Sequence, residues 1–310
     1  MGGAIREIAL GREPRDWDLA LSDAGDLARL EEIFGRRSFL LGKKPIQTHR
    51  LVAGETVIDI TILEESIEKD LRRRDFTMNA VAFDIRRDRV IDPLSGLHDI
   101  EGRLIRYPDR DTIASDPLRM LKAARHYAAL TGFTLHPELI EAMASSRDLI
   151  RKTAPERIKY ELDLIMISQG VHRGMEILTR TGLIFEIVPE LEALRVMDVE
   201  KNFSLETFGH TLLGFSFLHD RGGRYLANRA AAKDVGYALL FHDLGKAHTY
   251  SYDEVKGLVH FFNHERRSQE MASAIMERLR FSTHEMKRIS ALIEHHMRIF
   301  LISSAEATEK

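Results

Sequence analysis

Two aspartates, Asp16 and Asp18, flank the single tryptophan of the chain in a stretch predicted to be a strand that leads to a turn. Side chains alternate across a strand, so the two carboxylates share one face and Trp17 takes the other. Two carboxylates a few ångströms apart repel each other unless a cation lies between them. The pair is therefore either a solvated strand end or a clamp for a divalent metal.

A glycine pair upstream of the aspartates favours the second interpretation. Gly2 and Gly3 let backbone N–H groups approach a phosphate closely, the predicted helix start after them favours anions, and Arg6 lies one turn on. A phosphate loop followed by Asp-x-Asp is what two-metal nucleotidyl transfer requires, with Mg²⁺ activating a 3′-hydroxyl and neutralising the leaving pyrophosphate. Asp59, in the middle of the predicted strand 56–63, is a candidate third carboxylate.

Composition limits the class of protein. A chain of 310 residues predicts two or three domains, and 44% hydrophobic with 30% charged residues is typical of a soluble globular protein. The sequence has no cysteine, which excludes disulfides and thiolate metal sites and favours a reducing cytoplasm. No apolar run approaches the roughly 18–20 residues of a membrane span, and the first residues do not resemble a signal peptide. With a formal charge of −3, a nucleic-acid partner requires positive charge gathered in patches.

Hydrophobic periodicity divides the chain into two kinds of structure. Up to about residue 95 it predicts strands and helices, including a strand at 56–63 and a hairpin that turns at Arg86–Asp88. From about residue 112 it predicts helices, which are expected at 116–130, 154–168, 206–220, 228–242, 264–279 and 283–300.

Five motifs occur in order in the first half: GGAIRE, DWDLA, RRRDFTMNA, IDPLSGLHDIEG and SDPLR. Their order and spacing over about residues 2–165 resemble the class II tRNA nucleotidyltransferase and bacterial poly(A) polymerase family. The resemblance implies an α+β fold, with a small mixed-sheet, polymerase-beta-like head at 1–100, a helical neck at 101–200 and a helical domain at 201–310. It also implies Mg²⁺, tRNA and CTP or ATP as partners, and cytoplasmic localisation.

The resemblance assigns roles to the matching positions. The catalytic metal-binding carboxylates are Asp16 and Asp18, with Asp59 as the third. The nucleotide-binding residues are Gly2, Gly3 and Arg6 for the triphosphate, Arg74, Asp75 and Asn79 for ribose and phosphates, and Asp116 and Arg119 for the base.

The base-reading role is chemically consistent. A carboxylate accepts from the amino group of cytosine or adenine, while a guanidinium donates to the ring acceptors beside it. Uracil and guanine present a carbonyl where the amine should be, and the lost hydrogen bonds reject them.

Departures from the family pattern refine the expectation. Ser115 replaces a glutamate that orients the arginine, and Glu7 replaces an aspartate. The apolar strand that precedes the glycines in the family is not in this sequence, which suggests that the sequence is incomplete at this end. Only residues 60–71 separate Asp59 from Arg72, where family members that add the full CCA end carry a longer, arginine-containing loop. That loop helps switch specificity from CTP to ATP, so we expect a CC-adding enzyme; full CCA addition and poly(A) polymerisation are the alternatives.

Histidines gather in the last hundred residues, in a pattern H…HDxGK…H…HH. The pattern resembles the HD metal-dependent phosphohydrolase domain over about 205–300, and implies a divalent metal. The expected ligands are His210, His242, Asp243, His264 and His295, with Lys246 placed to contact phosphate. The family's further downstream aspartate does not occur before Lys310, so the site or the C-terminus is expected to be incomplete. A more distant alternative makes this domain the working enzyme and the head a degraded RNA-binding module.

Basic residues near the neck are candidates for RNA contacts, since tRNA phosphates favour lysine and arginine and the binding weakens with salt. The RNA-binding candidates are Arg147, Arg151, Lys152, Arg157 and Lys159, with similar basic character at Arg221, Arg224, Arg229 and Lys233.

Overall fold

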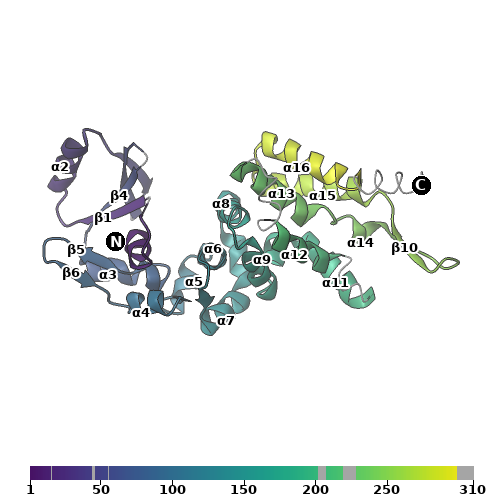
Figure 1. Cartoon of the computed structure of the whole chain (residues 1–310), viewed down its shortest axis with the longest axis horizontal. Coiled ribbons are helices and arrows are strands. Elements are labelled where there is room, and N and C mark those ends of the chain that lie inside the picture. Colours follow the sequence, from purple (N-terminus) through teal and green to yellow (C-terminus); the bar gives the residue numbers. More distant parts are fainter. Residues whose placement is uncertain (15, 44–45, 55, 202–206, 219–227, 299–310) are drawn as a thin grey trace. The chain divides into compact units, whose positions relative to one another are not determined.

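The chain forms two compact units in a computed structural model that describes residues 1–14, 16–43, 46–54, 56–201, 207–218 and 228–298 (Figure 1). The first unit comprises Met1–Ser115 and Gly132–Leu139. The second comprises Asp116–Thr131 and the chain from Ile140 onward. The predicted C-terminal domain and most of the predicted neck lie in the second unit, whereas residues 101–115 and 132–139 of the predicted neck belong to the first. The division near residue 200 stays a prediction.

A four-stranded mixed sheet is the centre of the first unit. The strand order is β1-β4-β3-β2, with β1 parallel to β4 and the other neighbours antiparallel. The strands are β1 (Asp16–Leu21), β2 (Phe39–Lys43), β3 (Ile46–Ala53) and β4 (Thr56–Ile62). The predicted α+β class is confirmed.

Alternation along β4 decides which face of the sheet is apolar. Ile58 and Ile60 are buried, and together with Leu51 of β3 they form a core on which Leu27 and Leu30 of α2 (Gly25–Phe34) pack. The residue between the two isoleucines, Asp59, therefore points to the opposite face. The sheet thus presents its carboxylates on the face away from α2.

Short elements complete the first unit. The hairpin predicted around Arg86–Asp88 is confirmed, because β5 pairs with β6 in antiparallel fashion. The remaining elements are α1 (Gly3–Ala9), α3 (Ile67–Arg72), the 3₁₀ turn η1 (Thr77–Asn79), β5 (Ala82–Asp84), β6 (Arg89–Ile91), α4 (Gly96–Glu101), β7 (Leu104–Ile105), α5 (Asp111–Ser115) and β8 (Thr134–Leu135).

Within its described residues, the second unit is helical except for one hairpin, formed by β9 (Tyr250–Asp253) and β10 (Leu258–Phe261). The periodicity did not predict this hairpin. The six predicted helices correspond to α6 (Leu118–Ala129), α8 (Pro155–Met166), α12 (Phe208–Phe217), α13 (Arg229–Phe241), α15 (His264–Arg278) and α16 (Thr283–His295). The other elements are η2 (Arg147–Lys152), α9 (Val171–Arg180), α10 (Leu183–Ile187), η3 (Pro189–Leu191), α11 (Glu192–Lys201) and α14 (Lys246–Thr249), with α7 (Pro137–Ser145) joining the two units. None of the described helices is long and apolar enough to cross a bilayer.

A charged network joins three helices of the second unit. Lys159 of α8 lies 2.7 Å from Asp163 and 3.1 Å from Glu285 of α16, and Lys233 of α13 lies 3.4 Å and 2.5 Å from the same two carboxylates. The Tyr237 hydroxyl donates to Asp163 at 2.8 Å. Burial alone would raise the pKa of Glu285, but hydrogen bonds from the lysines and from Ser282 outweigh it and hold the pKa well below its ordinary value of 4.5.

Glu285→Gln is expected to lower the free energy of unfolding by about 2 kcal/mol at neutral pH, because two ammonium groups then share one carboxylate. Since the pKa of Glu285 is lower in the folded than in the unfolded protein, its stabilising contribution is present at neutral pH. That contribution is lost as the pH falls below 4.5 toward the folded-state pKa. Denaturant unfolding at several pH values measures the difference between wild type and variant, which should shrink in acid. Glu277→Gln, at an exposed position of α15, is the control; an equal loss in both variants would contradict the role of the network.

Candidate functional site

The glycine pair lies against the residues with which the sequence grouped it. Gly2 has a φ of +64° and donates its N–H to the Val81 carbonyl at 2.9 Å. A Cβ atom there would lie 3.1 Å from Asp18 Oδ2, 3.6 Å from the Asn79 carbonyl and 3.7 Å from Arg74 Nη1. The structure therefore brings four predicted site residues together, and glycine is required both by the backbone conformation and by the space.

A chain of hydrogen bonds connects α1 to η1. Arg6 donates to Asn79 Oδ1 at 2.5 Å, and the Asn79 amide donates to Asp75 Oδ1 at 3.0 Å. Glu7, the departure from the family's aspartate, accepts from Arg6 Nη2 at 2.8 Å. Arg6, Asp75 and Asn79 are thus held as one polar unit in the first unit of the chain.

Asp18 carries a perturbed pKa in a cluster of negative charge. It stands in register with Asp59 on the neighbouring parallel strand, and Asp16 lies two residues earlier on the same face. Burial raises the pKa of Asp18, and the charges of Asp59 and Asp16 add to this, while Arg74 opposes it. Such a site favours a cation that would relieve the repulsion.

Asp59 is neutralised by a residue that the sequence analysis missed. Arg50, opposite Asp59 in the antiparallel β3–β4 register, donates from Nε and Nη2 to the two carboxylate oxygens, both at 2.7 Å. Among the described residues, the ligand atoms of Asp16, Asp18 and Asp59 do not all lie within 4.8 Å of one another. A metal-binding role for Asp59 therefore remains a prediction, and its observed partner is Arg50.

Residues of the IDPLSGLHDIEG motif contact η1. Thr77 Oγ1 donates to the buried Asp99 at 2.6 Å, and Arg106 donates to the other Asp99 oxygen at 2.7 Å. Gly96 packs so closely that a Cβ atom would lie 2.1 Å from the Thr77 carbonyl and 2.7 Å from Val81 Cγ2. The motif thus fixes the turn that carries Asn79.

The predicted base-reading residues lie at the beginning of α6, in the second unit. Asp116 Oδ1 accepts from the Leu118 N–H at 3.3 Å, and Asp116 Oδ2 accepts from Arg157 Nη2 at 3.0 Å. The Arg119 N–H donates to the Asp116 carbonyl at 3.0 Å, which places the two side chains in the same helical turn. Arg157 was expected to bind RNA, and the structure shows it bound to Asp116.

The other basic candidates divide into two groups. Lys159 lies inside the charged network, where its side chain is 12% exposed, so it is not presented to a ligand. Arg147 and Arg151 are exposed and both pair with Glu186, at 3.4 Å and 2.6 Å. Exposed positions are also found for Lys152 and Arg229, while Lys233 belongs to the network and Arg221 and Arg224 lie outside the described residues.

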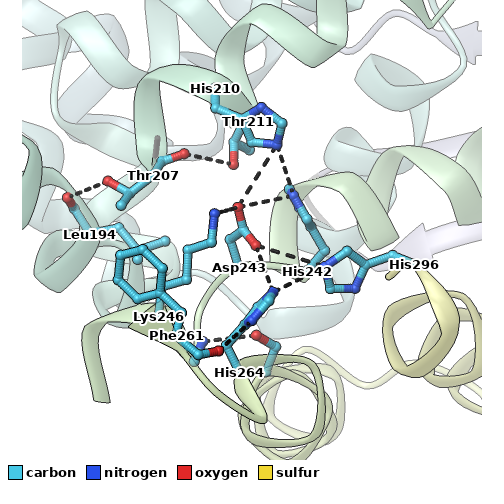
Figure 2. Close-up of polar contacts among 12 residues, drawn as sticks. Leu194, Thr207, His210, Thr211, His242, Asp243, Lys246, Phe261, His264 and His296 are labelled. Atoms are coloured by element: carbon cyan, nitrogen blue, oxygen red, sulfur yellow. Dashed lines mark hydrogen bonds and ion pairs between the residues drawn. The ribbon is translucent and has the colours of Figure 1, made fainter. Parts of the chain in front are cut away.

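Four of the five predicted histidine-site ligands meet in the second unit (Figure 2). His210 and His242 approach Asp243 Oδ2 at 3.8 Å and 3.1 Å, while His264 and His296 approach Oδ1 at 3.4 Å and 3.9 Å. Among the described residues, the ligand atoms form two groups that share Asp243, and each lies within 4.8 Å. Such a donor set suits a borderline divalent metal.

His296, and not the expected His295, belongs to this cluster. Ile293 of α16 is fully buried, and residue 296 follows it by almost one helical turn, so it falls on the same side. Residue 295 is rotated by about 100° from that position. Sequence spacing alone did not distinguish the two neighbouring histidines.

Backbone hydrogen bonds determine which ring nitrogen faces the cluster. The Nδ1 atoms of His242, His264 and His296 lie 2.7–2.8 Å from main-chain carbonyls, which only accept, so each Nδ1 carries the proton. In the neutral rings, Nε2 then presents a lone pair. His264 Nε2 and His296 Nε2 are 3.2 Å apart, and burial lowers the pKa of His296, which disfavours protonation. Two facing lone pairs at this distance are the arrangement that a metal cation resolves.

Asp243 is ionised despite its burial. Burial opposes ionisation, but His242, when its ring is protonated, and Lys246 outweigh it and hold the pKa of Asp243 well below its ordinary range. With the His242 ring neutral, Lys246 is the charge that stabilises the Asp243 carboxylate. Lys246 Nζ lies 2.9 Å from Asp243 Oδ2. Glycine at position 245 allows the chain after Asp243 to pack against α15, because a Cβ atom there would lie 2.4 Å from the His264 carbonyl.

Comparisons with known proteins find matches along most of the chain. Residues 1–106 match the model of the poly A polymerase head domain, 132–194 match a probable RNA- and SrmB-binding site of polymerase A, and 207–309 match the HD domain. An A-adding tRNA nucleotidyltransferase from Deinococcus radiodurans is 34% identical over 96% of this chain and 68% of its own length. A CC-adding tRNA nucleotidyltransferase from Thermus thermophilus is 32% identical over the same shares.

The chain belongs to the tRNA nucleotidyltransferase and poly(A) polymerase family. A multifunctional CCA protein from Xanthomonas campestris pv. campestris is 30% identical over 95% of this chain and 74% of its own length. Solved structures share the fold: a CCA-adding enzyme in complex with CTP has a TM-score of 0.64 at 18% identity, covering 98% of this chain and 68% of its own. The Thermotoga maritima CCA-adding enzyme in complex with tRNA has a TM-score of 0.56 at 19% identity, covering 97% and 76%. The expected enzyme class, a tRNA nucleotidyltransferase with an HD domain, is confirmed.

Gly96→Ala in this nucleotidyltransferase is expected to lower the free energy of unfolding by about 2–3 kcal/mol, because the added methyl group collides with the Thr77 carbonyl. Nucleotide incorporation should fall with it, since η1 carries Asn79. Thermal unfolding and an incorporation assay measure the two effects. Gly25→Ala is the matched control, because its nearest neighbouring atom would be 3.4 Å away; a Gly96→Ala protein as stable as this control would show that the close approach is dispensable.

Proposed function

We propose that this protein is a CC-adding enzyme, which transfers two CMP units from CTP to the 3′ end of tRNA and then stops. One observation carries the proposal: β4 ends at Ile62 and α3 begins at Ile67, so residues 63–66 alone connect the carboxylate strand to the nucleotide-binding segment. Ser66, the last residue of this connection, is the N-cap of α3, and its side chain accepts from the Lys69 N–H. The connection is therefore no longer than the turn between β4 and α3. It leaves no room for the longer loop that members adding the full CCA end carry at this place.

The residues of the first unit fit the first steps of transfer. Asp16 and Asp18 would hold Mg²⁺, which supplies Lewis-acid activation of the 3′-hydroxyl and charge neutralisation at the phosphate. Gly3 and Arg6 would hold the triphosphate, while Gly2, whose N–H is bound to the Val81 carbonyl, would allow the close approach without donating to it. Arg74, Asp75 and Asn79 would fix the ribose and phosphates, in an arrangement already organised by hydrogen bonds. In the second unit, Asp116 and Arg119 would read the base.

Incorporation of labelled CTP and ATP, each alone and together, onto tRNA that lacks its last three nucleotides tests the proposal. Two cytidines followed by a stop are expected, with ATP unused both on this tRNA and on tRNA that ends in CC. Asp18→Ala should lower incorporation by at least about 1000-fold, because it removes a proposed metal ligand, while Asp84→Ala, on the exposed β5–β6 hairpin, should be near wild type.

Other products would redirect the assignment. A completed CCA end, or a single A added to tRNA ending in CC as the name of the Deinococcus relative describes, would overturn CC addition. A long A tail would place the protein among poly(A) polymerases. Incorporation that survives in Asp18→Ala would overturn the metal assignment.

The histidine cluster supports a second activity, a metal-dependent phosphohydrolase in the HD domain. The specific observation is the pair of Nε2 lone pairs that face each other beside an ionised Asp243. Lys246, 2.9 Å from that carboxylate, is placed at the edge of the cluster, where it could meet a phosphate.

Adjacent histidines give this second activity an internal control. His296→Ala is expected to lose bound divalent metal, because it removes one of the converging Nε2 atoms, whereas His295→Ala should retain it. Metal content after dialysis against Mn²⁺ or Ni²⁺, together with phosphate release from a phosphomonoester, measures both. Equal retention in both variants would contradict the cluster as a metal site.

A further inference from the structure

Asp116 is held from two directions before any nucleotide binds. One oxygen accepts from the Leu118 N–H of its own helix, at 3.3 Å, and the other accepts from Arg157 Nη2 of α8, at 3.0 Å. A carboxylate offers about four lone-pair positions, so each oxygen keeps one position for a further donor. The Asp116 side chain is thus oriented and still has acceptor positions for a further hydrogen bond.

The glutamate that the family resemblance leads us to expect before Asp116 is replaced in this chain by Ser115. Family members have a glutamate where this protein has Ser115, and the Ser115 hydroxyl donates to the Thr112 carbonyl at 2.9 Å within the first unit. Ser115 therefore bonds back to its own helix, α5. Arg157 is the side chain that the described structure places on Asp116 instead.

A single ion pair with this exposure contributes little to stability. The Arg157 side chain is 53% exposed and that of Asp116 25%, and pairs of this kind are typically worth less than about 1 kcal/mol. What the contacts do control is direction, because Arg157 Nη2 holds one carboxylate oxygen while the Leu118 N–H holds the other, which restricts rotation of the carboxylate. The contact therefore affects the orientation of the Asp116 carboxylate more than the stability of the fold. Orientation affects function only if Asp116 binds a further hydrogen-bond donor.

We infer that Arg157 is a positioning residue for nucleotide selection, which aims the Asp116 carboxylate at the exocyclic amino group of the incoming base. This inference rests on the proposal that Asp116 reads the base. It replaces the expectation that Arg157 binds tRNA phosphates. Removing Arg157 frees the carboxylate to rotate, so a base with a carbonyl in place of the amine is no longer strongly rejected.

The measurement is the ratio of kcat/KM for CTP to that for UTP in the full-length protein, on tRNA lacking its last three nucleotides. Arg157→Gln is expected to lower this ratio about 10- to 100-fold. Arg157→Lys, which keeps one charged donor, should fall between wild type and Arg157→Gln. Asp116→Asn should also lower the ratio. Because Arg157 acts through Asp116, the double variant should be no worse than Asp116→Asn alone.

Glu156→Ala is the matched control for a change at the start of α8. Glu156 neighbours Arg157 and makes its own exposed ion pair with Arg280 at 3.8 Å, so the control removes a similar surface contact. Its nucleotide ratio and thermal midpoint should equal those of the wild type.

The alternatives give different readouts. One alternative is that Arg157→Gln lowers kcat/KM equally for CTP and UTP, raises KM for tRNA and weakens the salt dependence of tRNA binding. In that case Arg157 is an RNA contact and the inference is wrong. If kcat/KM for CTP and UTP falls equally and the thermal midpoint is lower, Arg157 has only a structural role, which also overturns the inference. An unchanged ratio in Asp116→Asn overturns the base-reading proposal itself, and a changed ratio there with none in Arg157→Gln overturns only the role of Arg157.

Discussion

Concentrated negative charge is the constraint on which the first unit depends. Parallel pairing of β1 and β4 puts Asp18 directly beside Asp59, with Asp16 on the same face. The sheet tolerates this because Arg50 binds both oxygens of Asp59 and Arg74 acts against the raised pKa of Asp18. One carboxylate is thereby neutralised by protein, and Asp16 and Asp18 are the two that the proposed function assigns to a cation. The open part of the site carries the charge of two aspartates rather than three.

The second unit meets the same constraint with different chemistry. Asp243 is surrounded by four imidazoles and Lys246, and three of those rings are fixed in one tautomer by main-chain carbonyls. Nitrogen donors around one carboxylate suit softer divalent metals than the all-oxygen pair Asp16 and Asp18, which suits Mg²⁺. The two proposed sites would therefore differ in the metals that they prefer, and one ion need not serve both.

Sequence reasoning located residues whose role follows from local spacing. Alternation along one strand was sufficient to pair Asp16 with Asp18, and the motifs were sufficient to group Gly2 with Asp18, Arg74 and Asn79, beside which it lies. Arg50 was missed because its contact with Asp59 requires the register of β3 against β4. His295 was chosen over His296 because the rotation of α16 about its axis is set by burial of Ile289 and Ile293, which spacing within a histidine pair does not reveal.

Basic residues were the least predictable, since a lysine or arginine looks the same in sequence whether it meets solvent or a carboxylate. Lys159 and Arg157 are two residues apart on α8, yet one is enclosed between Asp163 and Glu285 and the other holds Asp116. The hairpin β9–β10 was also missed, because its strands of four residues are too short for a clear period of two against the surrounding helices.

Selection between cytosine and adenine needs more than the hydrogen-bond pattern that the two bases share. Both present an amino donor beside a ring acceptor, so in the proposed base-reading role Asp116 and Arg119 would exclude uracil and guanine by hydrogen bonding but would not by themselves exclude adenine. The two rings differ in size, and the amino group of a purine stands farther from its sugar than that of a pyrimidine. A carboxylate that is free to shift can follow either, whereas one fixed by Arg157 and the Leu118 N–H matches a single distance. If the protein is the CC-adding enzyme proposed above, this restraint on Asp116 would keep the carboxylate at the distance that suits the smaller base, so adenine would be rejected although it offers the same hydrogen-bond pattern.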